Sequence, residues 1–270
     1  MIAETLIIST CVFAVAFMFA PIGMGGGMLF VPLLHYGLGW EINGALFAVS
    51  LSLTAVVSWG SGLAHRQNKH FDDSALKTGL WGAIPGAILG VLLVLMIGEK
   101  IDSVFKLLSL FMISWAIYNT ARKMRNAPRG TEELTDIETS IEPNRLKIGA
   151  GIGGVLSSVL AVGAGVIYVP VLRSFANLEP RKAIGTSLHF MMVVVPVAIA
   201  THLVALPEDM YRHLFAERFL IMAFVVLTFL GSRSGAKYGM RYLNEKQLMQ
   251  LFLLVILVLF TRYVLDLLPS

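Results

Sequence analysis

The sequence predicts an all-α integral membrane protein made of two inverted repeats, each with four helical segments. Hydrophobic residues make up 56% of the chain and charged residues only 14%. Apolar stretches long enough to cross a bilayer, roughly 20 residues each, follow one another along its whole length. A glycine-rich motif occurs twice, once near the start and once in the second half. These stretches leave no room for a separate soluble domain.

Eight apolar stretches can be marked, and they divide into four and four. They are residues 2–37, 42–64, 73–97, 102–121, 146–175, 183–203, 214–233 and 247–268. The first transmembrane repeat is therefore assigned to residues 1–121 and the second to residues 146–270. Residues 122–145 between them are rich in Glu, Thr, Arg, Asn and Pro, which predicts a flexible cytoplasmic linker.

The first stretch of each repeat contains glycines followed by a proline. Residues 25–34 read GGGMLFVPLL, and residues 163–172 read GAGVIYVPVL. Inside a helix glycine costs roughly 1 kcal/mol and proline roughly 3 kcal/mol, so both stretches are predicted to break there. Broken helices at membrane depth are buried in protein or line a cavity, and a matched pair of them predicts a transport site.

Other residues match in the same order in the two halves. The matched pairs are Ser50 with Ser187, His65 with His202, Gly86 with Gly231, and Gly90 with Gly235. Glycines four residues apart let two helix backbones approach closely. Duplication of a four-segment unit explains the matches, and chance similarity between apolar helices is the alternative.

Lys and Arg predict the orientation, because they gather on the cytoplasmic side of a membrane. If all eight stretches cross, these residues divide almost evenly between the two sides. If each interrupted stretch instead enters and leaves on one side as a re-entrant hairpin, most of them lie inside. Those left outside are Lys100, Lys106, Arg212, Arg218 and Arg262. The hairpin arrangement fits better, and it puts both termini outside and makes the two repeats antiparallel.

The two breaks are predicted to bind an anion. A short helix that starts at membrane depth has unpaired N–H groups and about half a positive charge at its N-terminus. Glycine leaves such a backbone open to a ligand. The residues assigned to the site are Gly25, Gly26, Gly27, Gly163, Ala164 and Gly165. The alternative is that the glycines only permit close helix packing.

A stripe of polar residues follows on the next stretch, and its spacing places it on one helical face. Its members are Ser50, Thr54, Ser58, Ser61 and His65. Ser50 and Thr54 are added to the substrate site. Their counterparts in the second half are Thr186 and Ser187. Hydroxyls that bond to a carbonyl one turn back are the alternative, with equal weight.

Three histidines and two tryptophans are assigned to the pathway or to coupling. His189 lies within an apolar run, where an ionisable side chain is costly and therefore suggests a function. His65 and His202 close their helices, where an interfacial residue bonded to a loop carbonyl is the alternative. Because histidine titrates near pH ~6.5, proton coupling stays open. Trp59 and Trp81 are pathway candidates, with helix packing as the alternative.

Several classes of function are not supported by the sequence. Cys11 is the only cysteine, so an internal disulfide, a CxxC pair and a cysteine metal cluster are excluded. Acidic residues fall at the ends of the apolar runs or in loops, and HExxH does not occur. We therefore expect no enzyme activity, metal or cofactor. The net charge of +4 comes from short loops between apolar runs, which indicates membrane orientation rather than nucleic-acid binding.

A resemblance to the TauE/SafE family of sulfite and sulfonate exporters covers nearly the whole chain. The motifs that carry it are Gly23–Leu34, Ser61–Arg66, Pro85–Gly90, Gly163–Leu172 and Ala183–Leu188. The resemblance implies a bacterial or archaeal cytoplasmic-membrane permease that moves small sulfur-containing or carboxylate anions, usually outward. It places the substrate near the two breaks, Ser50 and Thr186–Ser187. Ala164, where the first copy has a glycine, departs from the repeated pattern.

The expected function is secondary transport of a small sulfur-containing anion such as sulfite or an organosulfonate. The anion would be held at the paired helix N-termini and exposed to each side in turn. A passive anion channel, or an importer of a related carboxylate or sulfur anion, is the alternative. The expected partners are this anion and the lipid bilayer, with no nucleic acid. Formation of a homodimer is left open.

Overall fold

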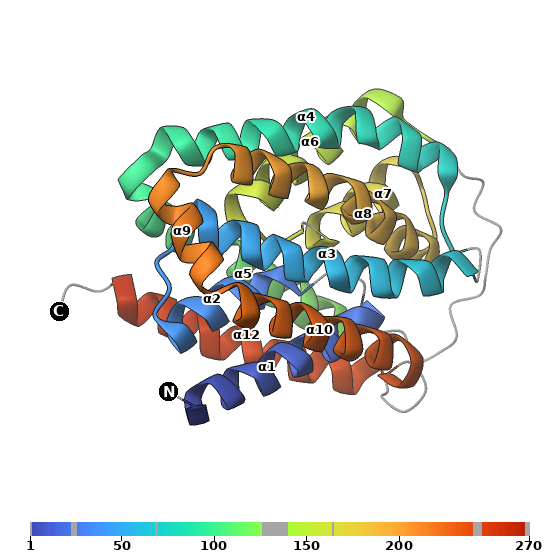
Figure 1. Cartoon of the computed structure of the whole chain (residues 1–270). Helices are drawn as coiled ribbons and strands as arrows, with labels where there is room; N and C mark the ends of the chain where they lie inside the picture. Colours follow the sequence, from blue (N-terminus) through green and yellow to red (C-terminus); the bar gives the residue numbers. More distant parts are fainter. Residues whose placement is uncertain are drawn as a thin grey trace.

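A computed structural model describes residues 2–22, 26–67, 70–125, 140–163, 165–239 and 245–267 (Figure 1). These residues form helices and connecting loops, with no strand among them. The helices are α1 (Ile2–Ile22), α2 (Gly27–Leu38), α3 (Gly44–Gln67), α4 (Asp73–Ile97), α5 (Ile101–Arg125), α6 (Pro143–Leu160), α7 (Gly165–Phe175), α8 (Pro180–Val204), α9 (Glu208–Ala216), α10 (Arg218–Ser234) and α12 (Glu245–Leu267). A short 3-10 turn (Gly98–Lys100) precedes α5, and a π turn (Gly235–Gly239) follows α10. The all-α prediction is confirmed, while most of the predicted linker lies outside the described residues.

Four apolar helical spans in the described part of the chain are long enough to cross a membrane. They are Gly44–Leu63, Asp73–Tyr118, Pro180–Val204 and Arg218–Tyr238. The outer faces of α4 and α10 carry large apolar side chains, among them Trp81 at 78% exposure and Phe219 at 75%. A continuous apolar outer surface of this kind needs lipid or another protein to cover it. The predicted membrane location agrees with these observations.

The first apolar stretch of each half is a pair of helices that run in opposite directions. In the second half the N–H of Glu142, just before α6, donates to the carbonyl of Phe175 at the end of α7 (2.8 Å). In the first half a Cβ atom on Gly37, near the end of α2, would lie 2.9 Å from Cδ1 of Ile8 in α1. Each pair therefore ends on the side from which it started.

The breaks in these pairs lie at the glycines and not at the prolines. Gly26 (φ 74°) and Gly163 (φ 71°) adopt the left-handed conformation, which glycine reaches without steric cost. Pro32 and Pro170 are accommodated inside α2 and α7. Both short helices continue beyond the repeated motif, α2 to Leu38 and α7 to Phe175.

Each half packs a helix closely against the first helix of the other half. A Cβ atom on Gly86 in α4 would overlap the carbonyl oxygen of Gly151 in α6, and one on Gly231 in α10 would lie 2.6 Å from the carbonyl oxygen of Phe13 in α1. Phe13 and Gly151 are as far apart in sequence as Gly25 and Gly163. The matched glycines therefore make equivalent backbone contacts in the two halves.

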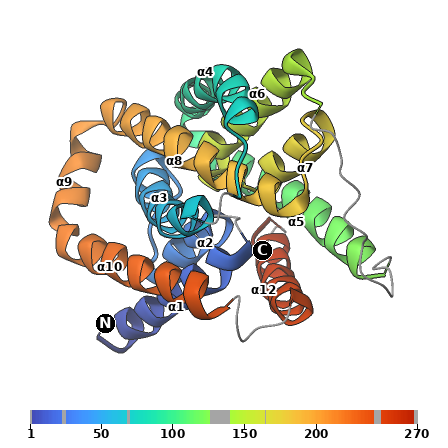
Figure 2. The ribbon, with the colours of Figure 1, turned by 90° about the vertical axis from the view of Figure 1, so that its right-hand side faces the viewer.

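Helices α3 and α8 pack against each other inside the bundle. Figure 2 shows them between α4 and α6 on one side and α1 and α10 on the other. The two halves differ where α8 continues to α10, because α9 is inserted there. This helix has a polar face and no buried residue, and the sequence analysis did not predict it.

Candidate functional site

The two helix breaks meet at Thr54, near the middle of α3. A Cβ atom on Gly27, the first residue of α2, would lie 2.6 Å from Thr54 Oγ1 and 2.6 Å from the Cα of Val162. A Cβ atom on Gly163 would lie 2.5 Å from Thr54 Cγ2. Breaks that are far apart in sequence therefore adjoin one another, and glycine is required at both because a side chain would fill the contact.

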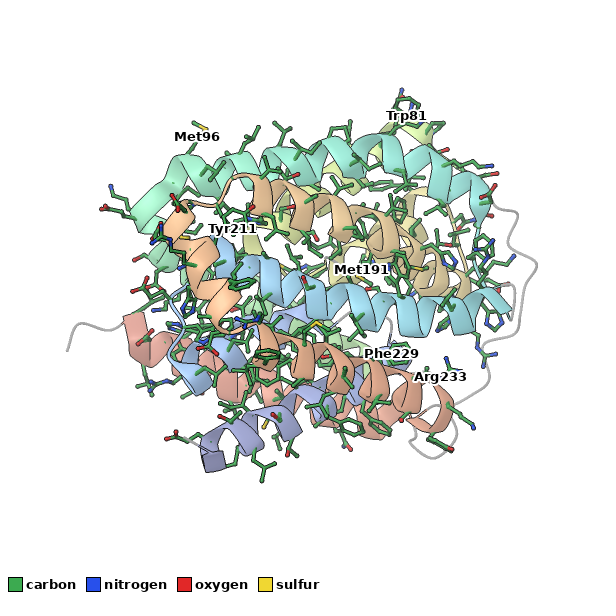
Figure 3. The ribbon with its side chains drawn as sticks, viewed as in Figure 1. Trp81, Met96, Met191, Tyr211, Phe229 and Arg233 are labelled. Carbon is green, nitrogen blue, oxygen red and sulfur yellow. The ribbon has the colours of Figure 1, made fainter. Side chains whose placement is uncertain are left out.

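The second spanning helix borders the same place. From Gly163, a Cβ atom would lie 3.1 Å from Met191 Sδ and 3.8 Å from Val195 Cγ2, both near the middle of α8. Met191 is fully buried, and Figure 3 places it inside the bundle. The breaks thus lie at about half the height of both spanning helices.

The polar stripe on α3 lies inside the protein, and most of its hydroxyls are bonded to carbonyls. Ser50 Oγ donates to the carbonyl of Ala161 at the second break (3.2 Å). Ser61 Oγ donates to the carbonyl of Ala20 near the first break (2.5 Å). Ser58 Oγ donates to the carbonyl of Thr54 one turn back (2.8 Å). These bonds satisfy carbonyls, including those left open where α1 and α6 end.

Thr54 differs from its neighbours on the stripe. Its side chain is fully buried, and within the described part of the chain its hydroxyl has no hydrogen-bond partner. A buried hydroxyl without a partner costs about 1–3 kcal/mol. A free hydroxyl between two helix starts is therefore the group most suited to a bound ligand.

The two predicted site residues on α8, Thr186 and Ser187, also differ in whether their hydroxyls have a hydrogen-bond partner. Thr186 Oγ1 accepts a hydrogen bond from the N–H of Asp72 (2.9 Å), which ties the loop before α4 to α8. Ser187 is fully buried, and its hydroxyl is unpartnered among the described residues. Thr186 therefore has a structural bond, while Ser187 keeps a free hydroxyl.

The backbone around the breaks favours negative charge. Helix α2 starts after Gly26, which offers no side-chain cap to the N–H groups of the first turn, and α7 starts at Gly165. Such helix starts carry partial positive charge. Among the described residues the only buried Lys or Arg is Lys106, which lies elsewhere. Gly25 and Ala164, also assigned to the site, lie outside the described residues.

The remaining predicted pathway residues are not among the atoms nearest to Gly27 and Gly163 at the breaks. His202 is 1% exposed and its Nε2 is 3.3 Å from the carbonyl of Ser158. His65 and His189 lie toward the end of the molecule where α3 ends and α8 begins. Trp59 is half exposed, and its indole N–H donates to the carbonyl of Met192 (3.3 Å). Trp81 points outward from α4 (Figure 3), so neither tryptophan lies at the breaks.

An ionic cluster at the start of α5 was not found from the sequence. Lys106 Nζ lies 2.8 Å from Asp102 and 2.5 Å from Asp266 in α12, and the side chain of Lys106 is only 9% exposed. Tyr36, in α2, donates to the same Asp266 carboxylate (3.2 Å). The spacing of four between Asp102 and Lys106 was a usable signal for an ion pair. The contact with Asp266 joins distant segments and had no local signal.

No group of three or more potential metal ligands occurs in the part of the chain that the structure describes. The site therefore consists of two helix starts, buried hydroxyls and apolar side chains. Such a site can bind a small anion through N–H and O–H donors.

Comparison with known proteins identifies the family of the chain. Residues 8–263 match the family "Sulfite exporter TauE/SafE". A "Probable membrane transporter protein" of Xylella fastidiosa strain 9a5c is 26% identical over 255 residues, covering 93% of this chain and 90% of that protein. A protein of the same description from Methanocaldococcus jannaschii is 28% identical over 173 residues, covering 61% of this chain and 60% of that protein.

No solved structure is significantly similar to the chain. The family match extends over nearly all of the sequence, and the relatives are described as membrane transporters rather than enzymes. The chain therefore belongs to the TauE/SafE family of sulfite exporters.

Proposed function

We propose that this protein is a secondary transporter that exports a small sulfur-containing anion, such as sulfite or an organosulfonate, across the cytoplasmic membrane. The observation that carries the proposal is the meeting of the two breaks at Thr54. Gly27 from one half and Gly163 from the other both lie against this unpartnered, fully buried threonine. Sulfite and sulfonates suit the site because their oxygens accept several hydrogen bonds at once.

In this proposal the backbone binds the charge and the hydroxyls orient it. The N–H groups at the starts of α2 and α7, around Gly26, Gly27 and Gly165, face the anion. Thr54 donates its hydroxyl hydrogen to an anion oxygen, and Ser187 is available as a second donor. Ser50 holds the backbone of the second break through Ala161. No buried cation is needed, so the anion can also leave.

The two halves are proposed to lie in opposite orientations in the membrane, with the breaks as tips of re-entrant hairpins. Two observations support this arrangement. The ends of each helix pair adjoin, as the bond between Glu142 and Phe175 illustrates. The loop residue His70 packs against Gly185 of α8, so the basic residues after α3 and before α8 lie at one end of the molecule. That end is expected to be cytoplasmic.

Transport would proceed by movement of the two halves about the central site, which opens it to each side in turn. An inside-negative potential favours exit of an anion by about 2.3 kcal/mol per charge per 100 mV. Export therefore needs no further driving force when the anion accumulates inside.

The test is counterflow in proteoliposomes that contain the purified protein. Vesicles loaded with unlabelled sulfite, sulfoacetate, thiosulfate or the simple carboxylate malonate are diluted into the same labelled anion. A carrier accumulates label transiently, whereas a passive channel only equilibrates it. Absence of counterflow with every anion would overturn the proposal. Counterflow of a carboxylate alone would favour the alternative substrate class.

A further inference from the structure

Three histidines meet at one end of the bundle, around Gly185 in the second turn of α8. A Cβ atom on Gly185 would overlap the carbonyl oxygen of His70 and lie 3.5 Å from the Cβ of His65. The ring centres of His65 and His70 are 6.2 Å apart. Nδ1 of His189 lies 2.7 Å from the carbonyl of Gly185. The end of α3, the loop before α4 and the start of α8 therefore bring these rings into one cluster.

The cluster contains buried ring nitrogens that bond to nothing in the described part of the chain. These are both ring nitrogens of His65 and Nε2 of His189. The two residues are only 8% and 7% exposed. Buried polar atoms in native proteins nearly always have a partner, so these three nitrogens are the atoms of the cluster available to bind a ligand.

The hydrogen bond of His189 decides how its ring can act. Nδ1–H donates to the Gly185 carbonyl, which leaves Nε2 as an acceptor in the neutral ring. Uptake of a proton turns Nε2 into a second donor. The ring of Phe71 stacks on His189 with centres 4.6 Å apart, which fixes its plane. A protonated His189 would therefore present an N–H group to a ligand in a fixed direction.

The surroundings of the cluster are mainly basic. The charged residues on the elements around it include Arg66 on α3, Asp72 in the loop, Asp73 and Lys77 on α4, Arg173 on α7, Glu179 just before α8, Arg181 and Lys182 on α8, and Arg233 on α10. Lys77 pairs with Asp73 (2.5 Å), and the Asp72 carboxylate accepts from the N–H of Ala75 (2.8 Å). Asp72 and Asp73 thus have partners of their own, and no acidic side chain among the described residues bonds to the unpartnered ring nitrogens.

The surroundings of His65 disfavour its protonated form. His65 follows Leu63, where the apolar span of α3 ends. Burial lowers the pKa of His65, and the nearby His70 and His189 lower it further. An anion bonded to the rings would act in the opposite direction, because it stabilises the charged imidazolium.

We propose that His65, His70 and His189 form an entrance site that binds the transported anion together with a proton. This inference rests on the proposed function, since the site lies on the route to the breaks. His65 and Thr54 are on the same face of α3, about 16 Å apart at 1.5 Å per residue. Ser58 and Ser61 lie between them on that face. A sulfonate or sulfite group fits the cluster because its oxygens can accept from several N–H donors.

The site predicts that the anion binds more tightly as the pH falls. Methanesulfonate is a suitable probe, because its own charge stays constant between about pH 5.5 and pH 8, the range in which histidine titrates. Its binding to purified protein would be measured by calorimetry across this range. For the wild type we expect the affinity to rise about tenfold, which corresponds to a shift of one unit in the pKa of the cluster.

Glutamine variants separate the cluster from other histidines. His65→Gln and His189→Gln should each flatten this pH dependence while methanesulfonate still binds at pH 8. His213→Gln is the matched control, because His213 is exposed on α9 at the opposite end of the bundle, where its ring meets that of Trp40 edge to face (centres 5.4 Å apart). It should keep the full pH dependence. Thermal unfolding of all three variants checks that they fold.

Histidine NMR signals give a second readout. In the wild type, addition of methanesulfonate should raise the titration midpoints of the cluster histidines and leave that of His213 unchanged. A pH-independent affinity in the wild type, or an unchanged slope in both cluster variants, would overturn the entrance site. Neither result would touch the central site, which is tested by counterflow at a fixed pH. Conversely, counterflow can fail while methanesulfonate still raises the titration midpoints of the cluster histidines. That result would overturn the proposed transport function and leave the entrance site standing.

Discussion

The two helix breaks share a backbone plan but differ in chemistry. Both breaks lie against Thr54 in the middle of α3. The residue at the corresponding position of the second half, Met191, is not polar. Thr54 is separated from Met191 by the same sequence distance as Ser50 from Ser187. Gly163 accordingly borders the Thr54 methyl group on one side and the Met191 sulfur on the other. The free hydroxyl that borders both breaks, that of Thr54, therefore comes from the first half.

The backbone of the second break is also held differently. Ala161 adopts the left-handed conformation (φ 50°), which costs an alanine about 1–2 kcal/mol, whereas the described left-handed residue at the first break is Gly26. Ala161 is fully buried, and its carbonyl accepts the hydroxyl of Ser50. A residue of the first half thus stabilises a strained residue of the second. Both breaks thus lie at left-handed glycines, but contacts with the other half hold them differently.

The largest effect is expected from Gly27→Ala. The added methyl group would lie 2.6 Å from the Cα of Val162, a backbone atom that cannot rotate away, so the two breaks must separate. Counterflow should fall below detection while the protein still inserts into the membrane. Gly151→Ala is the control, because its methyl group would meet no atom closer than 3.4 Å. Normal transport by Gly27→Ala would refute the meeting of the breaks as the site.

Thr54→Val tests whether the hydroxyl that borders both breaks contributes to anion binding. Valine keeps the shape and removes the hydroxyl, and a hydrogen bond to a charged group contributes about 1.5–3 kcal/mol, so anion affinity should fall by about 10- to 100-fold. The melting temperature should not fall, because the hydroxyl has no partner to lose among the described residues. Ser58→Ala serves as control, since that hydroxyl bonds within its own helix. Equal affinity in Thr54→Val and wild type would remove Thr54 from the site.

The variants Gly86→Ala and Gly231→Ala test how closely α4 packs against α6 and how closely α10 packs against α1. Overpacking of this kind costs about 1–3 kcal/mol, and both changes place a methyl group against a backbone carbonyl of the other half. We expect both to lower the melting temperature in detergent. Gly86→Ala should lower it more, because its methyl group overlaps the Gly151 oxygen whereas that of Gly231 lies 2.6 Å from the Phe13 oxygen. The reverse order would contradict the close contact of α4 with α6.

Met191→Leu should have the smallest effect. The exchange conserves volume and typically costs less than about 1.5 kcal/mol, so initial rates of counterflow should stay within a few fold of wild type. A loss as large as that of Thr54→Val would show that the sulfur of the second half matters as much as the hydroxyl of the first.

Much of this site could be predicted because its signals are local. Glycine in place of a side chain, repeated within an apolar run, identified both breaks without any structure. The spacing of Ser50, Thr54, Ser58 and Ser61 identified a single helical face, and that face is buried. The spacing could not tell which hydroxyl stays free. Ser50 and Ser61 donate to carbonyls of Ala161 and Ala20, which are far away in the sequence. The spacing of residues along α3 cannot predict such contacts.

The sequence by itself determined the all-α class and the position of the two breaks, because composition, periodicity and glycine content set helices and their interruptions. Only the tertiary structure decided what meets at the centre and at the ends. Thr54 with Gly163, His70 with Gly185 and Lys106 with Asp266 are contacts between segments that are far apart in the sequence. They depend on how apolar surfaces pack in three dimensions, and packing brings together residues that local sequence cannot relate.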